Sequence, residues 1–195
     1  MPADDRSVSP ALLAATTTTL RRLGPRQFTL TAVAEEAGVS RGTVHNALGS
    51  RENAIRTALD HLASVFIEAM AAEVDRQETL AEQVAAAGVL VCAHRQGSDS
   101  VAPRGINESI LVLLLRNIGD DLMARSLELW RPLVRAAKAR GEVRPDVDPL
   151  RAGEWIVRML LSFELLPPMG VNIDNPRAVR RFLCDHIVAG LGGRA

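Results

Sequence analysis

The sequence predicts an all-α protein with about nine helices. Its 195 residues include no tyrosine and only 3% aromatic residues, and its abundant alanine and leucine favour helices over strands. Glycine and proline are concentrated in short interludes between longer stretches of helix-favouring residues. A chain of this length forms one compact domain or a small module joined to a larger one.

Three short helices and one long helix are predicted in the N-terminal part of the chain. Caps and breaks place them at about residues 10–23, 32–37, 41–48 and 51–76. Each follows a residue that can accept a hydrogen bond from the first helical turn, namely Ser9, Thr31, Ser40 and Ser50. Gly24-Pro25 ends the first helix, and Gly38 ends the second.

Five more helices are predicted in the rest of the chain, at about residues 79–95, 107–117, 121–140, 149–166 and 176–191. Asn175 caps the last of these helices, and Pro176 occupies its first position. The helix over residues 107–117 is apolar almost all round, so we expect it to lie buried inside the larger domain. The expected division is a small domain over residues 1–56 and a larger helical domain over residues 57–195.

The composition argues against several classes of protein. The 23 basic and 23 acidic residues balance, so binding to nucleic acid would require a local basic patch. With two cysteines and no recognisable secretory signal, a disulfide framework is not expected and the protein is predicted to be cytoplasmic. Apolar runs stop well before 18 residues, which predicts no membrane span. Phosphate-binding and catalytic motifs do not occur, so neither an enzyme nor a cofactor is expected.

Residues 28–59 have the pattern of a helix-turn-helix. The first helix has an apolar stripe along one side, formed by Val33, Ala34 and Ala37. The second helix has two apolar residues four positions apart, Val44 and Leu48. Gly38 supplies the tight turn, and Val39 is expected to plug the corner. In this motif the second helix enters the DNA major groove and the first crosses the backbone.

The second helix carries small or hydrogen-bonding residues at the positions that would face DNA: Arg41, Gly42, Thr43, His45 and Asn46. Arg41 can donate to guanine O6 and N7, Asn46 can pair with adenine, and the Thr43 methyl can contact thymine. Gly42 would let the backbone approach the bases closely.

Other residues of this segment are suited to phosphate contacts. Thr31, Ser40 and Arg51 lie at helix starts, where hydroxyls and free amides suit phosphate oxygens. Between residues 20 and 58, six arginines and three glutamates give a charge of +3. The same pattern can also occur in a helical bundle whose charges form a solvated surface.

The segment resembles the N-terminal domain of the TetR family of transcriptional regulators. The residues that match the family pattern are Val33, Ala34, Ala37, Gly38, Val39, Ser40, Gly42, Thr43, Ser50, Arg51 and Glu52. The close resemblance runs from Phe28 into the fourth helix, and the rest of the chain agrees in length and helix plan. Two positions depart from the pattern. His45 replaces a tyrosine that touches phosphate, which makes such a contact pH-sensitive, and Leu48 replaces an aromatic residue.

The resemblance implies a ligand cavity in the C-terminal domain. Candidate lining residues are Phe66, Met70, His94, Asn107, Glu108, Ile110, Leu111, Leu114, Met123, Trp130, Met159 and Phe163. Most of these are also typical core residues. Because the walls would be aliphatic and rich in methionine, we expect a small, largely apolar effector. No metal site is expected in the pairs Cys92/His94 and Cys184/His186, since residues two apart on a helix point to nearly opposite sides.

Each of the last two predicted helices has a wide apolar stripe along one side. Such stripes can pack within their own domain or form a four-helix bundle with a second copy. The resemblance favours a homodimer, with the interface at Trp155, Met159, Val179, Phe182, Leu183, His186, Ile187 and Gly190.

The sequence therefore predicts a TetR-like homodimeric repressor of transcription. It would bind a pseudo-palindromic operator in double-stranded DNA and release it when an apolar effector binds, with the long fourth helix carrying the change. The alternatives are a helix-turn-helix DNA-binding protein with no effector and a helical interaction module.

Overall fold

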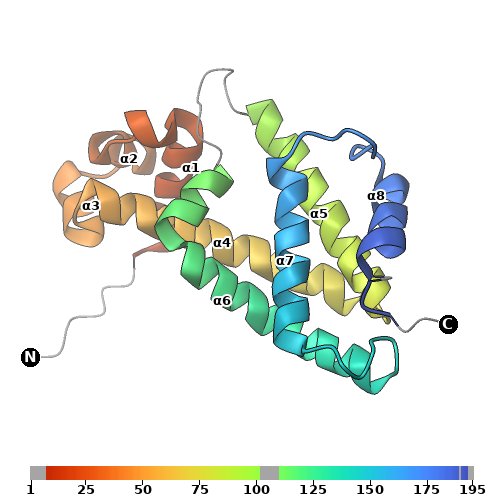
Figure 1. Cartoon of the computed structure of the whole chain (residues 1–195). Coiled ribbons are helices and arrows are strands. Elements are labelled where there is room, and N and C mark those ends of the chain that lie inside the picture. Colours follow the sequence, from red (N-terminus) through yellow and green to blue (C-terminus); the bar gives the residue numbers. More distant parts are fainter. Residues whose placement is uncertain (1–7, 102–109, 189, 193–195) are drawn as a thin grey trace, which may run out of the picture. The chain divides into compact units, whose positions relative to one another are not determined.

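The computed structural model describes residues 8–101, 110–188 and 190–192, without the side chains of residues 96–101, 187 and 188. All the secondary structure of these residues is helical, which confirms the predicted all-α class (Figure 1). They form eight α-helices and one π-helical segment, where the sequence predicted about nine helices. None of the described helices is both long enough and apolar enough to cross a membrane.

The helices belong to two compact units. Of the described residues, unit 1 contains 8–65, 101 and 110–119, and unit 2 contains 66–100, 120–188 and 190–192. The division expected from the sequence, after residue 56, assigned the whole of residues 101–119 to the larger domain. The two units are described separately below.

Unit 1 is built from five helical segments: α1 (Pro10–Gln27), α2 (Leu30–Ala37), α3 (Arg41–Leu48), the first part of α4 (Arg51–Asp75) and the first turns of α6 (Ile110–Ala139). Its core contains side chains with almost no exposed surface, among them Leu20, Phe28, Val33, Val44, Leu48 and Leu59. Burial of this apolar surface is the main force that holds the short helices together.

Serine side chains cap the helices of unit 1 as predicted. Ser9, Ser40 and Ser50 each accept a hydrogen bond from the backbone N–H three residues ahead, at 3.3, 3.1 and 3.1 Å. The break predicted at Gly24-Pro25 is present as a kink, because Gly24 has a φ of 68° inside α1.

The predicted cap of α2 is wrong. Thr29, not Thr31, is the N-cap and accepts a hydrogen bond from the Ala32 N–H at 3.1 Å. Phe28 precedes this cap and Val33 follows it by four residues, and both are fully buried in one core. That arrangement is a hydrophobic staple, which fixes where the helix begins.

Unit 2 contains the remainder of α4 and α6 together with α5 (Leu80–Val101), α7 (Pro149–Leu165), α8 (Pro176–Phe182) and the π-helical segment η1 (Leu183–Val188). Trp130, with 1% of its surface exposed, is among the largest side chains in its core. Gly88 of α5 allows a close approach, because a Cβ atom there would collide with the side chain of Leu183.

The break predicted between the helices at residues 107–117 and 121–140 is present as a kink, because Ile118, with a φ of −138°, is non-helical inside α6. The predicted position of the first of these helices is wrong. It was expected inside the larger domain, but Leu113 is buried in the core of unit 1, with Ile110 and Leu114 packed against that core. An apolar helix surface predicts burial without indicating which core receives it.

The ends of two other predicted helices also differ from the structure. Helix α5 continues to Val101, beyond the expected end at residue 95. The last helix, expected over residues 176–191, is divided into α8 and η1.

Candidate nucleic-acid interface

Helix α3 is fixed to unit 1 by a tight turn and two buried side chains. Gly38 ends α2 with a φ of 65°, in the left-handed region that favours glycine, and its N–H bonds back into α2. Val44 and Leu48, with 0% and 1% of their surface exposed, attach one side of α3 to the core. The opposite side is therefore free of packing contacts with unit 1. Val39, expected to plug the corner, is instead 40% exposed.

The structure places the predicted base-reading residues together on the exposed side of α3. They are Arg41, Gly42, Thr43, His45 and Asn46. Among the described residues, Arg41 has no ion-pair or hydrogen-bond partner, so its guanidinium can donate to an external acceptor. The Thr43 Oγ1 lies 2.9 Å from the Ser40 Oγ, which occupies the hydroxyl and leaves the methyl as the available group.

The residues expected to contact phosphate have different surroundings. Ser40 is an exposed N-cap, and Thr31 is exposed in the first turn of α2. Thr29, which the sequence analysis did not select, is also exposed and begins α2. The staple formed by Phe28 and Val33 is the sequence signal that could have identified it.

Arg51 faces the protein's own backbone. Its Nε donates a hydrogen bond to the Phe28 carbonyl at 2.9 Å, and its Nη2 donates to the Pro25 carbonyl. Its Nη1 lies 3.7 Å from a carboxylate oxygen of Glu52. The guanidinium therefore joins the start of α4 to the chain between α1 and α2.

Exposed arginines give the described part of unit 1 its positive charge. Arg22 of α1 forms an ion pair with Glu36 of α2 at 3.1 Å, so one basic group is neutralised. Arg21, Arg26 and Arg56 are exposed, like Arg41. Exposed guanidinium groups are suited to phosphate contacts that add affinity without sequence preference.

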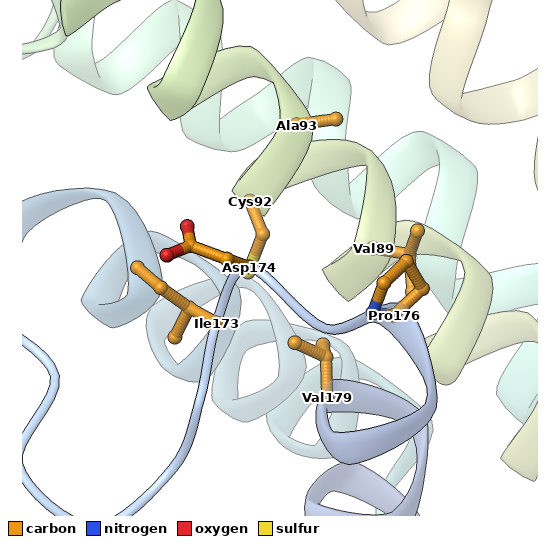
Figure 2. A pocket seen from close by; sticks show the side chains of 7 residues that line it. All are labelled: Val89, Cys92, Ala93, Ile173, Asp174, Pro176 and Val179. Carbon is orange, nitrogen blue, oxygen red and sulfur yellow. The ribbon is translucent and has the colours of Figure 1, made fainter.

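Unit 2 contains a small pocket between α5 and the segment that leads into α8 (Figure 2). Val89, Cys92 and Ala93 line it from α5, and Ile173, Asp174, Pro176 and Val179 line it from the other side. Its volume of about 50 Å³ is well below the several hundred Å³ of typical ligand pockets. It shares no residue with the lining predicted from the sequence.

The residues predicted to line an effector cavity are divided between the units. Ile110, Leu111 and Leu114 belong to unit 1. Of those in unit 2, Met70, Trp130 and Phe163 are buried in its core, and Phe66, Met123 and Met159 pack against it. The His94 Nδ1 lies 3.8 Å from a Glu164 oxygen, and its ring contacts Phe66. Asn107 and Glu108 lie outside the described residues.

The predicted dimer residues differ in exposure. Val179 and Leu183 are fully buried in the core of their own unit. Trp155, Met159 and Phe182 are partly exposed, and His186 and Gly190 are exposed. The Phe182 ring lies edge-to-face with Phe163 and stacks on His186, at 5.9 and 4.7 Å between ring centroids. The side chain of Ile187 lies outside the described residues.

Cys92 and Cys184 form no disulfide, and both thiols are protonated at neutral pH. Burial raises the pKa of the Cys92 thiol to about 11, and burial also raises the pKa of Cys184. The described residues contain no cluster of three histidine, cysteine or acidic side chains placed to hold a metal ion.

Comparison with known proteins identifies the fold. No protein-family model and no curated protein sequence matches the chain. Solved structures of transcriptional regulators do match it. A TetR-family regulator from Cytophaga hutchinsonii has a TM-score of 0.69 at 15% identity, with 97% of this chain and 100% of that chain covered.

Two fatty-acid-related regulators have the same fold. FadR from Bacillus halodurans has a TM-score of 0.66 at 14% identity, covering 93% of this chain and 98% of its own. FadR from Bacillus subtilis, in complex with stearoyl-CoA, has a TM-score of 0.63 at 15% identity, covering 92% and 95%. The chain has the fold of the TetR-family transcriptional regulators, which confirms the fold that the sequence resemblance implied.

Proposed function

We propose that the protein is a DNA-binding transcriptional regulator of the TetR type. The observation that carries the proposal is the exposed side of α3. Arg41, Thr43, His45 and Asn46 lie together there, while Val44 and Leu48 hold the helix to the core. The likeness in fold to transcriptional regulators supports the same function. DNA readout by a short exposed helix requires this combination of rigid attachment and exposed hydrogen-bonding groups.

The regulator acts as a homodimer on a pseudo-palindromic operator. Trp155, Met159, Phe182 and His186 provide the interface, since they have exposed surface that Val179 and Leu183 lack. A two-fold dimer presents two copies of α3, and half-sites are then about 34–36 Å apart or a multiple of this distance.

A small, largely apolar effector releases the DNA, so that the protein is a repressor. The stearoyl-CoA bound to FadR of Bacillus subtilis supports an apolar effector for a protein of this fold. The pocket of about 50 Å³ between α5 and the segment that leads into α8 is too small for such a molecule, so the effector fits this pocket only if the pocket widens.

A pocket of about 50 Å³ is also compatible with a second candidate function, that of a regulator with no effector. Its DNA binding would be constitutive or controlled by another protein. Thermal-shift measurements with long-chain acyl compounds distinguish the two functions, because an effector raises the melting temperature by mass action and releases bound DNA. Stabilisation only by sugars or nucleotides would contradict the apolar effector.

Selection of bound sequences from a random DNA pool tests the proposed function itself. We expect enrichment of a two-fold symmetric sequence at moderate salt. Failure to bind any duplex at low salt, by protein whose helical content is intact, would favour an interaction module instead.

A further inference from the structure

The first turn of α4 holds two other parts of unit 1 in place. Arg51, the first residue of α4, donates hydrogen bonds to the backbone carbonyls of Phe28, at 2.9 Å, and Pro25. These two carbonyls belong to the chain that ends α1 and precedes α2. The planar guanidinium has several donors in fixed directions, so it can bind two carbonyls at once.

Asn53 makes the corresponding contact with α3. Its Nδ2 donates a hydrogen bond to the Leu48 carbonyl at 2.9 Å. Leu48 is the last residue of α3, and carbonyls in the last turn of a helix have no partner within the helix. In a helix of only eight residues, this bond satisfies one of the carbonyls of the last turn, and the Gly49 N–H satisfies that of His45 at 2.8 Å.

We propose that Arg51 and Asn53 are positioning residues for DNA recognition, an inference that rests on the proposed function. Together they fix the end of α3 and the end of α1, directly before the N-cap of α2, to the same turn of α4. The base-reading side of α3 and the exposed caps of α2 therefore keep one relative geometry. Neither residue needs to touch DNA for its loss to weaken binding.

This role differs measurably from a phosphate contact by Arg51. A phosphate contact depends on the positive charge, and its loss lowers the salt dependence of binding by about 0.9 in the log–log slope. A positioning role depends on the two-carbonyl geometry, which lysine cannot reproduce although it retains the charge. Substitution by lysine and by methionine separates charge from geometry.

The test compares Arg51→Lys and Arg51→Met with Arg56→Met, which removes the charge of an exposed arginine on the same helix that forms no ion pair or hydrogen bond with the described residues. The probe is the duplex that the wild-type protein selects from a random pool. We expect both Arg51 variants to lose about tenfold in affinity, as for one well-placed hydrogen bond. Arg51→Met should leave the salt slope at its wild-type value, whatever the slope of Arg56→Met.

The opposite pattern would overturn the proposal. It consists of wild-type affinity for Arg51→Lys and a salt slope for Arg51→Met whose magnitude is smaller than that of the wild-type protein by about 0.9. All affinities are measured at a temperature where circular dichroism shows wild-type helical content, so that loss of folding does not imitate loss of positioning.

Asn53→Ala provides an independent test, because it removes the bond to Leu48 without changing charge. We expect a loss of about three- to tenfold in affinity with an unchanged salt slope, and faster amide hydrogen exchange at the end of α3. Unchanged exchange in α3 would overturn the positioning role of Asn53. If the wild-type protein binds no DNA, that result contradicts the proposed function alone. Hydrogen exchange in Arg51→Lys and Asn53→Ala then still tests whether these residues hold α3 and the end of α1 in place.

Discussion

Units 1 and 2 bury apolar residues in the same way but differ in what they leave exposed. In unit 1 the exposed side of α3 carries Arg41, Thr43, His45 and Asn46, side chains whose hydrogen-bonding groups match those of DNA bases. In unit 2 the large exposed side chains include Leu166 and Met169, which are apolar. Exposed polar groups restrict the possible ligand by their chemistry, whereas exposed apolar groups do not identify the ligand or protein surface that would cover them.

The units also differ in how local their structure is. The caps and turns of α2 and α3 are set by residues at most five positions apart, such as Ser40 with Thr43. Unit 2 depends on distant pairs. Arg95 donates hydrogen bonds to the carbonyls of Phe163 and Leu166 at 2.8 and 2.6 Å, and Glu142 accepts one from the Leu80 N–H at 2.8 Å. We therefore expect mutations in unit 2 to change mainly stability or dimerisation, and mutations on the exposed side of α3 in unit 1 to change mainly DNA recognition.

The largest effect on stability is expected from Trp130→Ala. Trp130 is 1% exposed in the core of unit 2, and its truncation should cost about 3–5 kcal/mol through lost burial and an internal cavity. Chemical denaturation measures this loss. Trp155→Ala, which truncates a partly exposed tryptophan, is the matched control and should cost less. DNA sequence preference should stay unchanged, and an altered preference would contradict the separation of the two roles.

Phe182→Asp should abolish the proposed dimer. Its ring is partly exposed at the proposed interface, and an unpaired charge there opposes association. Loss of the second half-site should lower operator affinity by about a hundredfold or more. Light scattering and DNA binding measure the two effects. Arg181→Asp introduces the same side chain at the neighbouring exposed position and should remain dimeric. A Phe182→Asp dimer with normal affinity would move the interface elsewhere.

Arg41→Ala should change specificity more than stability. Because its exposed guanidinium is available for a bidentate contact with guanine, its loss should cost about 1–3 kcal/mol at one base position. Competition between the selected operator and single-base variants measures this effect. Equal losses on operator and random DNA would show instead that Arg41 contacts phosphate.

Sequence reasoning predicted unit 1 better because its signals are local. The turn at Gly38, the cap at Ser40 and the exposed side of α3 all follow from neighbouring residues. The role of Arg51 did not, since its carbonyl partner Phe28 lies 23 positions away and no pattern marks that distance. Thr29 and Thr31 are both threonines that could cap α2, and only the buried pair Phe28 and Val33 distinguishes Thr29 as the cap.

In unit 2 the apolar pattern predicted helices but not their packing. Residues 110–115 were expected in the larger domain, yet Leu113 is buried in unit 1, because any apolar core accepts such a helix. The side of α8 that carries Val179 packs inward, whereas Phe182 keeps exposed surface, and spacing alone does not distinguish the two. Effector residues in particular cannot be separated from core residues by their apolar character.

The smallest effect, and the one most dependent on pH, is expected from Glu142→Gln. Its carboxylate bonds to Arg140 at 2.6 Å and accepts the Leu80 N–H at the start of α5. The bond from Arg140, and then that from Leu80, hold the pKa of Glu142 below its ordinary value of 4.5. A carboxyl whose pKa is lowered on folding stabilises the protein above its unfolded pKa. This contribution is lost as the pH falls through the folded pKa.

The free energy of unfolding of the glutamine variant should therefore be about 1 kcal/mol lower than that of the wild-type protein at pH 7, a difference kept small by solvent exposure. The difference should shrink below pH 4.5. Denaturation of unit 2 at several pH values measures it. Asp146→Asn, which removes the carboxylate of a more exposed ion pair with Arg144, should show a smaller difference at pH 7. Equal behaviour of the two variants would mean that the charge of Glu142 stabilises unit 2 no more than the charge of an exposed ion pair does.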